Sequence, residues 1–185
     1  TFLTKLKSSS TLPKTAAPPP ALYTPIYQKI KDTGDSAIVI CPSAELSGTV
    51  RSATVAAQDF PETDIRVIDS RTLGTGLGSV VRQAVKWAAA GLTADEVVAK
   101  IEDMITREHV YFLVDTLEYL YKGGRIGGAQ MFLGSLLQVK PILTIKNGRA
   151  EPVDQQRTKR RALARIKELV RTECPRNEEA FISVM

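Results

Sequence analysis

The amino-acid sequence predicts an α/β protein, in which a parallel-sheet βαβ domain is followed by a second, smaller and here incomplete α/β domain. Three apolar segments rich in β-branched residues, 36–41, 64–70 and 109–115, are typical of buried strands. Segments with helical periodicity separate them, and this alternation predicts parallel strands with helices on both faces of the sheet. The pattern changes after the third strand, so we place the domains at 1–120, which lacks its first strand, and 121–185.

The first part of the chain begins with a segment that favours no regular structure. Residues 1–19 are rich in Ser, Thr and Pro and are expected to form a connecting segment. A helix is predicted over 21–31, with Pro25 early in it, where proline is tolerated. The first strand then leads through the loop PSAELSGT into a helix over 50–60.

Two further helices are predicted between the second and third strands. The first spans 76–90 and is followed by Gly91, a residue suited to the left-handed conformation just beyond a helix. The second begins with Thr93 and Glu96, which have the spacing of a capping box.

The elements after the third strand are shorter. Asp115 and Glu118 have capping-box spacing and predict a short helix that ends in YKGGRIGG. AQMFLGSLL, residues 129–137, predicts another short helix. KPILTIKNGRAEPV predicts a hairpin whose turn is Asn147-Gly148, a pair that favours the type I′ turn. The end of the chain, AFISVM, resembles the start of a strand.

Composition limits the possible functions. The 185 residues are 43% apolar and 24% charged, as in a globular domain. No apolar run reaches the roughly 18–20 residues that span a bilayer, and the N-terminal residues lack the apolar core of a signal peptide. Two distant cysteines, Cys41 and Cys174, and the single His109 argue against a disulfide framework and against a zinc site. We therefore expect a cytoplasmic protein without membrane insertion, metal or cofactor.

The net charge of +5 is concentrated in one predicted helix. Residues 157–171 contain seven Lys or Arg and one Glu, with apolar residues at helical spacing, and Cys174-Pro175 ends the segment. This basic helix is either a solvated face, a docking surface for an acidic or phosphorylated partner, or a nucleic-acid contact. Nucleic acid is the least favoured, because no aromatic residues interleave with the cations and no recognised DNA or RNA motif accompanies them.

The loop SAELSGT, residues 43–49, is the first candidate site. It follows a predicted parallel strand and precedes a helix, the edge of an α/β sheet where ligands bind. Unpaired N–H groups at the helix start, with the hydroxyls of Ser47 and Thr49, could hold a carboxylate or phosphate. Alternatively, Ser47 or Thr49 is only the N-cap of the helix.

Arg125, within YKGGRIGG, is the second candidate. Gly123 or Gly124 can end the preceding helix in the left-handed conformation. Arg125 is then either an exposed residue of a helix–loop–helix corner or a guanidinium that faces an anion, since five planar donors suit a carboxylate or phosphate. Thr15 is a third position, but the residues around it give it no role on their own.

Several segments together resemble the DegV family of bacterial fatty-acid-binding proteins, which includes the acyl-carrying subunits of fatty acid kinase. The matching segments are SAELSGTVRSA, VIDSRTLGTGLG, DTLEYLYKGGRIGGAQMFLGSLLQVKPIL and NGRAEPVDQQRTKRRA. Their order and spacing agree over nearly the whole chain, and the L-x-x-L-x-x-G-G-R-I pattern followed by K-P-I-L is specific.

The resemblance implies a binding protein rather than an enzyme, without catalytic residues. In the family a long-chain fatty acid lies in an apolar tunnel between two α/β domains, with its carboxylate near hydroxyls from two loops. Those loops match Ser47-Gly48-Thr49 and Thr15-Ala16-Ala17-Pro18, which makes Thr15 a candidate ligand-binding residue. A kinase subunit then phosphorylates the carboxylate, and Arg125 would lie beside the head group or the kinase.

Two aspects of the resemblance leave alternatives open. Met131, Phe132, Leu136 and Leu137 could line the tunnel, although ordinary core packing explains them equally well. The family's opening strand and T-D-S-T-x-D-L loop, and its closing histidine-containing segment, have no match in this chain, and Ala16 replaces the usual second hydroxyl of the first loop. The alternative functions are an enzyme that modifies a small anion at the Ser47 loop, and a regulatory interaction through the basic helix.

Overall fold

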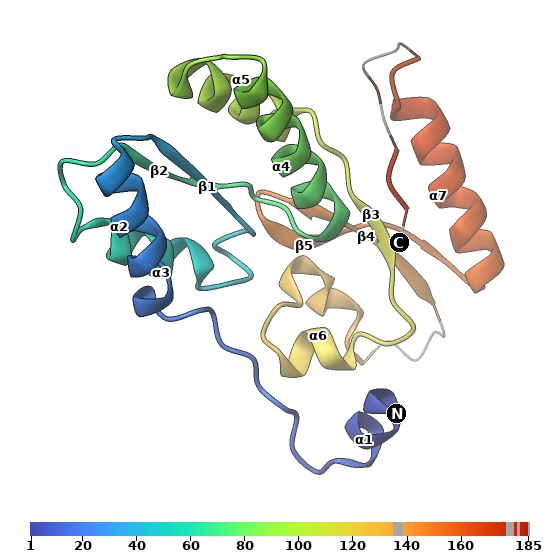
Figure 1. The fold of residues 1–185 in the computed structure, drawn as a ribbon. Coiled ribbons are helices and arrows are strands. Elements are labelled where there is room, and N and C mark those ends of the chain that lie inside the picture. The colour runs from blue at the N-terminus through green and yellow to red at the C-terminus, as the bar shows by residue number, and fades with distance from the viewer. Residues whose placement is uncertain (135–138, 177–179, 181, 185) are drawn as a thin grey trace.

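The computed structural model describes residues 1–134, 139–176, 180 and 182–184. It confirms the α/β fold, which contains two sheets (Figure 1). The first is a parallel pair, β1 (Ala37–Cys41) and β2 (Ile65–Asp69). The second is antiparallel, in the order β3 (Tyr111–Leu113), β4 (Lys140–Lys146) and β5 (Arg149–Gln156).

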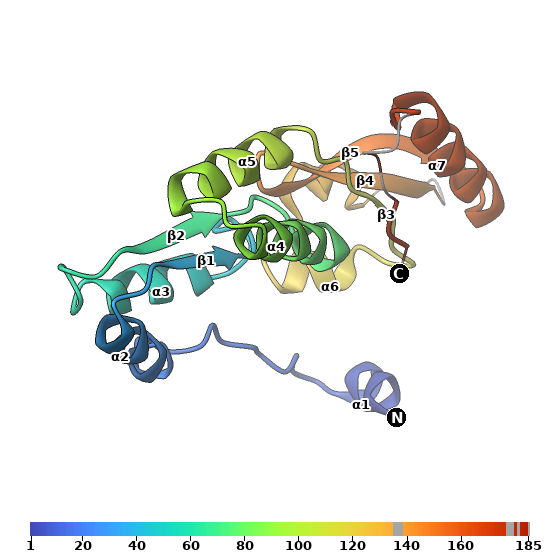
Figure 2. The same cartoon turned by 45° about the horizontal axis from the view of Figure 1, so that its top comes forward.

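Helices cover both faces of the parallel pair, as the sequence predicts (Figure 2). Those on one face are α2 (Thr24–Thr33) and α3 (Thr49–Ala57), and those on the other are α4 (Gly74–Ala89) and α5 (Ala94–Thr106). Alternate strand residues serve the two faces: Val39 packs against buried Tyr27 and Phe60, whereas Ile38 and Ile40 pack against buried Val80 and Ile101. The pair thus packs between two apolar layers.

The first nineteen residues contain a helix that the sequence prediction missed. α1 spans Phe2–Ser8, and the Thr1 hydroxyl caps it by accepting from the Thr4 N–H. No α1 residue is buried. Both views show this helix apart from the sheets, joined to the rest of the chain by an extended segment without helix or strand. The short 3₁₀ helix η1 (Pro20–Leu22) then leads into α2, so the remainder is a connector as expected.

The third strand does not join the first sheet, so the prediction of a third parallel strand there is wrong. β3 pairs antiparallel with β4, with Phe112 opposite Leu143. A short, continuously apolar segment can belong to a parallel or to an antiparallel sheet. Its hydrophobic pattern indicates that the strand is buried but not which strand it pairs with. The division of the chain at residue 120 stays a prediction.

The short elements after β3 differ in detail from their predictions. α6 (Glu118–Lys122) begins after Leu117, which makes no side-chain cap, and the Glu118 N–H donates to the Thr116 hydroxyl, so the predicted Asp115 capping box is wrong. The Asp115 carboxylate instead contacts Lys159 Nζ at 3.0 Å. The next helix is the 3₁₀ helix η2 (Gly127–Phe132), and the predicted positions Leu136 and Leu137 lie outside the described residues.

The hairpin and the basic helix are confirmed. Asn147 and Gly148 both have positive φ, 51° and 79°, as a type I′ turn requires. α7 (Lys159–Glu173) begins at the Thr158 cap, ends at Cys174, and buries Ala162 and Leu169 against β4. The predicted terminal strand is absent from described residues 180 and 182–184.

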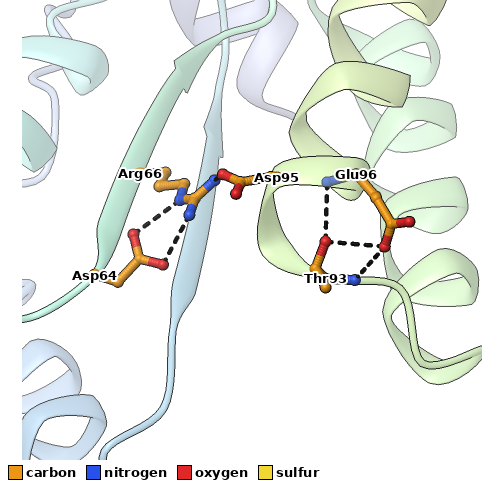
Figure 3. Close-up of polar contacts among 5 residues, drawn as sticks. All are labelled: Asp64, Arg66, Thr93, Asp95 and Glu96. Carbon is orange, nitrogen blue, oxygen red and sulfur yellow. Dashed lines mark hydrogen bonds and ion pairs between the residues drawn. The ribbon is translucent and has the colours of Figure 1, made fainter.

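The helix boundaries around α5 follow from side-chain and glycine chemistry. Thr93 Oγ1 accepts from the Glu96 N–H, and the Glu96 carboxylate accepts from the Thr93 N–H at 2.8 Å, which confirms the capping box (Figure 3). Arg66 on β2 bridges Asp64 and Asp95 beside it. Gly91, with φ of 85°, follows the end of α4 as predicted. These contacts fix where α5 begins against the first sheet.

Candidate ligand-binding site

The SAELSGT loop lies between β1 and α3 and bends into a compact turn. The main-chain N–H of Ser47 donates to the Ser43 carbonyl oxygen at 2.9 Å. The Ser47 and Thr49 hydroxyls are 2.8 Å apart, and Ser47 Oγ also accepts from the Thr49 N–H. The helix α3, which is nine residues long, begins directly after Gly48. Two half-buried hydroxyls therefore meet at the positive end of a helix dipole, where an anion is favoured.

Arg125 contacts this loop from the second half of the chain. Its Nε donates to the Leu46 carbonyl oxygen at 3.0 Å, and its NH1 donates to the Gly123 carbonyl oxygen. Both acceptors are neutral, so neither neutralises the guanidinium charge. The structure thus brings Arg125 to the residue that precedes Ser47, while its side chain remains exposed.

The glycines around Arg125 have separate structural reasons. Gly124, with φ of 71°, ends α6, and the Arg125 N–H donates back to the Leu120 carbonyl oxygen. A Cβ on Gly127 would lie 2.1 Å from the Ala150 carbonyl oxygen, so only glycine lets this backbone approach β5. The segment is therefore a helix end, an arginine and a close approach to the second sheet.

The Thr15 loop lies next to the SAELSGT loop. A Cβ built on Gly48 would be 3.4 Å from Ala17 Cβ, which is ordinary van der Waals contact. Thr15 itself is exposed. Its loop therefore lies beside the loop that carries Ser47 and Thr49.

The loop is also tied to the turn of the β4–β5 hairpin, a connection that the sequence did not reveal. Ser43 is fully buried, and its hydroxyl donates to the Gly148 carbonyl oxygen at 2.8 Å. Beside it, Glu45 forms an ion pair with Arg149 at 2.7 Å. A serine within a polar loop gives no sequence signal of such burial, because its partner lies 105 positions away.

The loop that follows β2 is connected to the SAELSGT loop through Asp69. Asp69, the last residue of β2, accepts from the Ala44 N–H at 3.2 Å and from the Arg71 N–H at 2.9 Å through one carboxylate oxygen. Arg71 has φ of 53°, and this bond helps to hold that conformation. Asp69 therefore orients both the loop after its own strand and the SAELSGT loop.

Burial raises the pKa of two side chains near these two loops. Desolvation raises the pKa of the Glu108 carboxyl, although a hydrogen bond from the Thr72 hydroxyl at 3.1 Å lowers it in part. Desolvation also raises the pKa of the buried Cys41 thiol, with a further contribution from the Asp69 charge. Both effects favour the neutral form, so neither group resembles an activated nucleophile or a strong acid.

The described part of the chain has open hollows at its surface, and neither of the two best defined includes Thr15, Ser47 or Arg125. One, of about 370 Å³, is lined largely by apolar side chains, among them Val114, Leu117 and Phe132. The other, of about 510 Å³, lies along the hairpin beside Glu45 and Arg149. Met131, by contrast, is 72% exposed. The predicted tunnel remains a prediction.

Among the described residues, no helix is both long and apolar enough to cross a membrane. That same part of the chain contains no group of three or more His, Cys, Asp or Glu side chains placed to hold a metal ion.

The fold and the contacts of the SAELSGT loop define an α/β protein in which this loop of the first sheet bonds the hairpin turn of the second. Comparison with known proteins gives the family: the model described as "Uncharacterised protein, DegV family" matches residues 1–185. A DegV domain-containing protein of Streptomyces coelicolor is 43% identical over 156 residues, which are 84% of this chain and 55% of that protein. The chain belongs to the DegV family.

Solved structures agree with this assignment. A DegV family protein from Thermus thermophilus, described by its fatty acid binding, is 37% identical with a TM-score of 0.85, over 92% of this chain and 60% of that one. DegV from Bacillus subtilis, described as a fatty acid binding protein, is 32% identical with a TM-score of 0.77, over 92% and 61%. The chain thus spans about three fifths of the length of these relatives.

Proposed function

We propose that this protein binds a long-chain fatty acid, with the carboxylate at the SAELSGT loop. One observation supports the proposal: the Ser47 and Thr49 hydroxyls meet at the start of α3, Arg125 donates to the carbonyl oxygen of the preceding Leu46, and the Thr15 loop lies against Gly48. The relatives from Thermus thermophilus and Bacillus subtilis, both described as binding fatty acid, support the choice of ligand. We assign the head group to Thr15, Ser47, Gly48, Thr49 and Arg125.

The chemistry of these groups suits an ionised carboxylate. Hydroxyls and main-chain N–H groups that donate to a carboxylate stabilise its charged form. The α3 dipole and the Arg125 guanidinium add favourable electrostatics. The head group would therefore remain an anion, which is the form that can accept a phosphoryl group.

Affinity would come mainly from the tail. Burial of each methylene contributes roughly 0.8 kcal/mol, so a long acyl chain outweighs the few polar contacts at its head. We propose that the tail lies in an apolar tunnel between the two domains, with Phe132 as one candidate lining residue.

We further propose that the protein is a carrier and not an enzyme, and that it presents the carboxylate to a fatty acid kinase in the cytoplasm. An enzyme at this loop would require a base, and within the described part of the chain the Ser47 hydroxyl contacts Thr49 and not a histidine or carboxylate. A carrier needs only to hold the acyl chain and leave its carboxylate accessible.

Native mass spectrometry of gently purified protein tests the binding. We expect a bound mass equal to that of a long-chain fatty acid, and renewed uptake when oleate is added to delipidated protein. Ligand-free spectra in both cases would overturn the proposal. Phosphorylation of the bound oleate by a fatty acid kinase and ATP tests presentation separately, and turnover of a small anion by the isolated protein, abolished by Ser47→Ala, would favour the enzyme instead.

A further inference from the structure

Ser43 is the first residue of the SAELSGT loop, here called the ligand loop, and is fully buried. Buried polar groups are rarely left without hydrogen bonds. Ser43 uses every group that it has: its N–H donates to the Thr72 carbonyl oxygen at 2.9 Å, and its hydroxyl donates to Gly148 and accepts from the Glu45 N–H. Its carbonyl oxygen accepts from the Ser47 N–H. Ser43 is therefore fixed in one orientation.

The partners of Ser43 come from three separate segments. Thr72 belongs to the loop after β2, Glu45 and Ser47 to the ligand loop itself, and Gly148 to the turn between β4 and β5. One residue thus connects the first sheet, the ligand loop and the second sheet.

Steric requirements at Gly148 show how close this approach is. A Cβ on Gly148 would lie 2.5 Å from Ser43 Oγ, and φ of 79° at this position already disfavours other residues. The contact and the turn therefore both require glycine, and they place the Gly148 carbonyl oxygen directly on the serine hydroxyl.

We infer that Ser43 is a positioning residue, whose hydroxyl sets the ligand loop, and with it the Ser47 hydroxyl, against the hairpin turn. The inference rests on the proposed function, because its effect on binding is exerted through Ser47. The effect follows from geometry: the Ser43 carbonyl oxygen accepts from the Ser47 N–H, and its hydroxyl bonds the hairpin turn at Gly148. Loss of the hydroxyl therefore leaves the Glu45–Arg149 ion pair as the described contact between this loop and the hairpin, and loosens the position of Ser47.

The experiment compares Ser43→Ala with Thr93→Ala, which loses the distant cap of α5 and serves as a control of similar expected destabilisation. A fluorescent long-chain fatty acid measures affinity, and thermal melting measures stability. We expect Ser43→Ala to weaken binding about five- to tenfold, the effect of one buried hydrogen bond, while Thr93→Ala leaves binding unchanged. Ser43→Thr, which keeps the hydroxyl, should restore most of the affinity if it folds.

Equal affinities for Ser43→Ala and Thr93→Ala would overturn the positioning role. A double-mutant cycle of Ser43→Ala and Gly148→Ala gives a second measure that needs no ligand. Because Ser43→Ala removes the oxygen that a Cβ on Gly148 would meet, we expect the two changes to be strongly non-additive in stability. Additive effects would also overturn the inference. Failure of the wild-type protein to bind any fatty acid would overturn the proposed function, and the cycle would then decide whether Ser43 and Gly148 act together.

Discussion

The Nε of Arg125 donates to the main-chain carbonyl oxygen of Leu46 across 3.0 Å, which joins the GGRI segment to the candidate ligand loop. This contact gives the arginine a role before any ligand or partner is considered, because it braces the residue that precedes Ser47. The remaining guanidinium N–H groups and the positive charge stay exposed at the same place.

Arg125→Ala should therefore lower fatty-acid affinity moderately, by about fivefold, the effect of one hydrogen bond of roughly 1 kcal/mol. Arg125→Lys should restore this only partly, because an ammonium lacks the planar set of donors. Titration with a fluorescent fatty acid measures both. If Arg125→Ala binds normally but kinase-coupled phosphorylation fails, the arginine serves the kinase and not the lipid.

Ser47→Ala removes the oxygen that accepts from the Thr49 N–H and contacts the Thr49 hydroxyl. We expect a loss of affinity of about tenfold or more, since a charged acceptor loses a donor. Thr15→Ala should act in the same direction. Thr54→Ala, an exposed position on α3, is the control and should bind like the wild type. Unchanged affinity in both loop variants would place the carboxylate elsewhere.

The capping box makes a separate prediction about pH. Hydrogen bonds from the main-chain N–H and hydroxyl of Thr93 lower the pKa of the Glu96 carboxyl below its ordinary value of 4.5. A lowered pKa contributes stability that is present above the unfolded value and is lost as the pH falls through the folded value. Thr93→Ala removes the hydroxyl and keeps the main-chain N–H, and this loss of a helix cap should lower the melting temperature at neutral pH by about 2–4 °C. The difference from the wild type should narrow on acidification below about pH 4.5, and a constant difference would contradict the argument.

The pH dependence of stability expected from Glu108 is opposite to that expected from Glu96. Burial raises the pKa of its carboxyl, so the folded protein holds this proton more tightly than the unfolded chain does. Stability contributed by the protonated form is therefore full below the unfolded pKa and falls as the pH rises through the folded pKa. Glu108→Gln, which can still accept from the Thr72 hydroxyl, should raise the melting temperature at pH 7 and have little effect at pH 4. Destabilisation at pH 7 would show that the charge is needed.

Gly127 and Gly124 provide a matched pair for backbone strain. Both have positive φ, 52° and 71°, but a Cβ on Gly124 meets nothing within 4 Å, whereas one on Gly127 meets the Ala150 carbonyl oxygen. Gly124→Ala should cost about 1–2 kcal/mol, the penalty of the left-handed conformation. Gly127→Ala should cost distinctly more, because β5 must shift. Urea unfolding measures both, and equal costs would contradict the close approach.

Helix ends and turns could be predicted from the sequence where the residues that form them are neighbours along the chain. The Thr93 and Glu96 box, the Asn147-Gly148 turn and Gly91 all follow from rules that act within a few residues. Asp115 shows the limit of such rules: its spacing to Glu118 fits a capping box, but its carboxylate pairs with Lys159 and the Glu118 N–H donates to Thr116. A local motif fails where a distant partner competes for the same side chain.

The errors over longer range have a common physical cause. The strand at Tyr111–Leu113 has the apolar composition of a buried strand, and composition does not specify whether a parallel or an antiparallel neighbour covers it. The sequence does not indicate the burial of Ser43 for the same reason, since its burial depends on a hairpin turn far along the chain. Ser47 and Arg125 could be predicted as candidates because a strand-to-helix loop and a glycine-rich turn mark them locally, whereas Thr15 needed the family motif.

The contact between Ser43 and Gly148 closes a loop of 105 residues, which has a consequence for the order of folding. Contacts of high sequence separation incur the entropy of loop closure before they add stability, so they form late. The β4–β5 hairpin, joined by a two-residue turn, and the local helix caps can form early. The chain would then acquire its secondary structure first and its ligand loop last, and a ligand present during refolding would act on that final step.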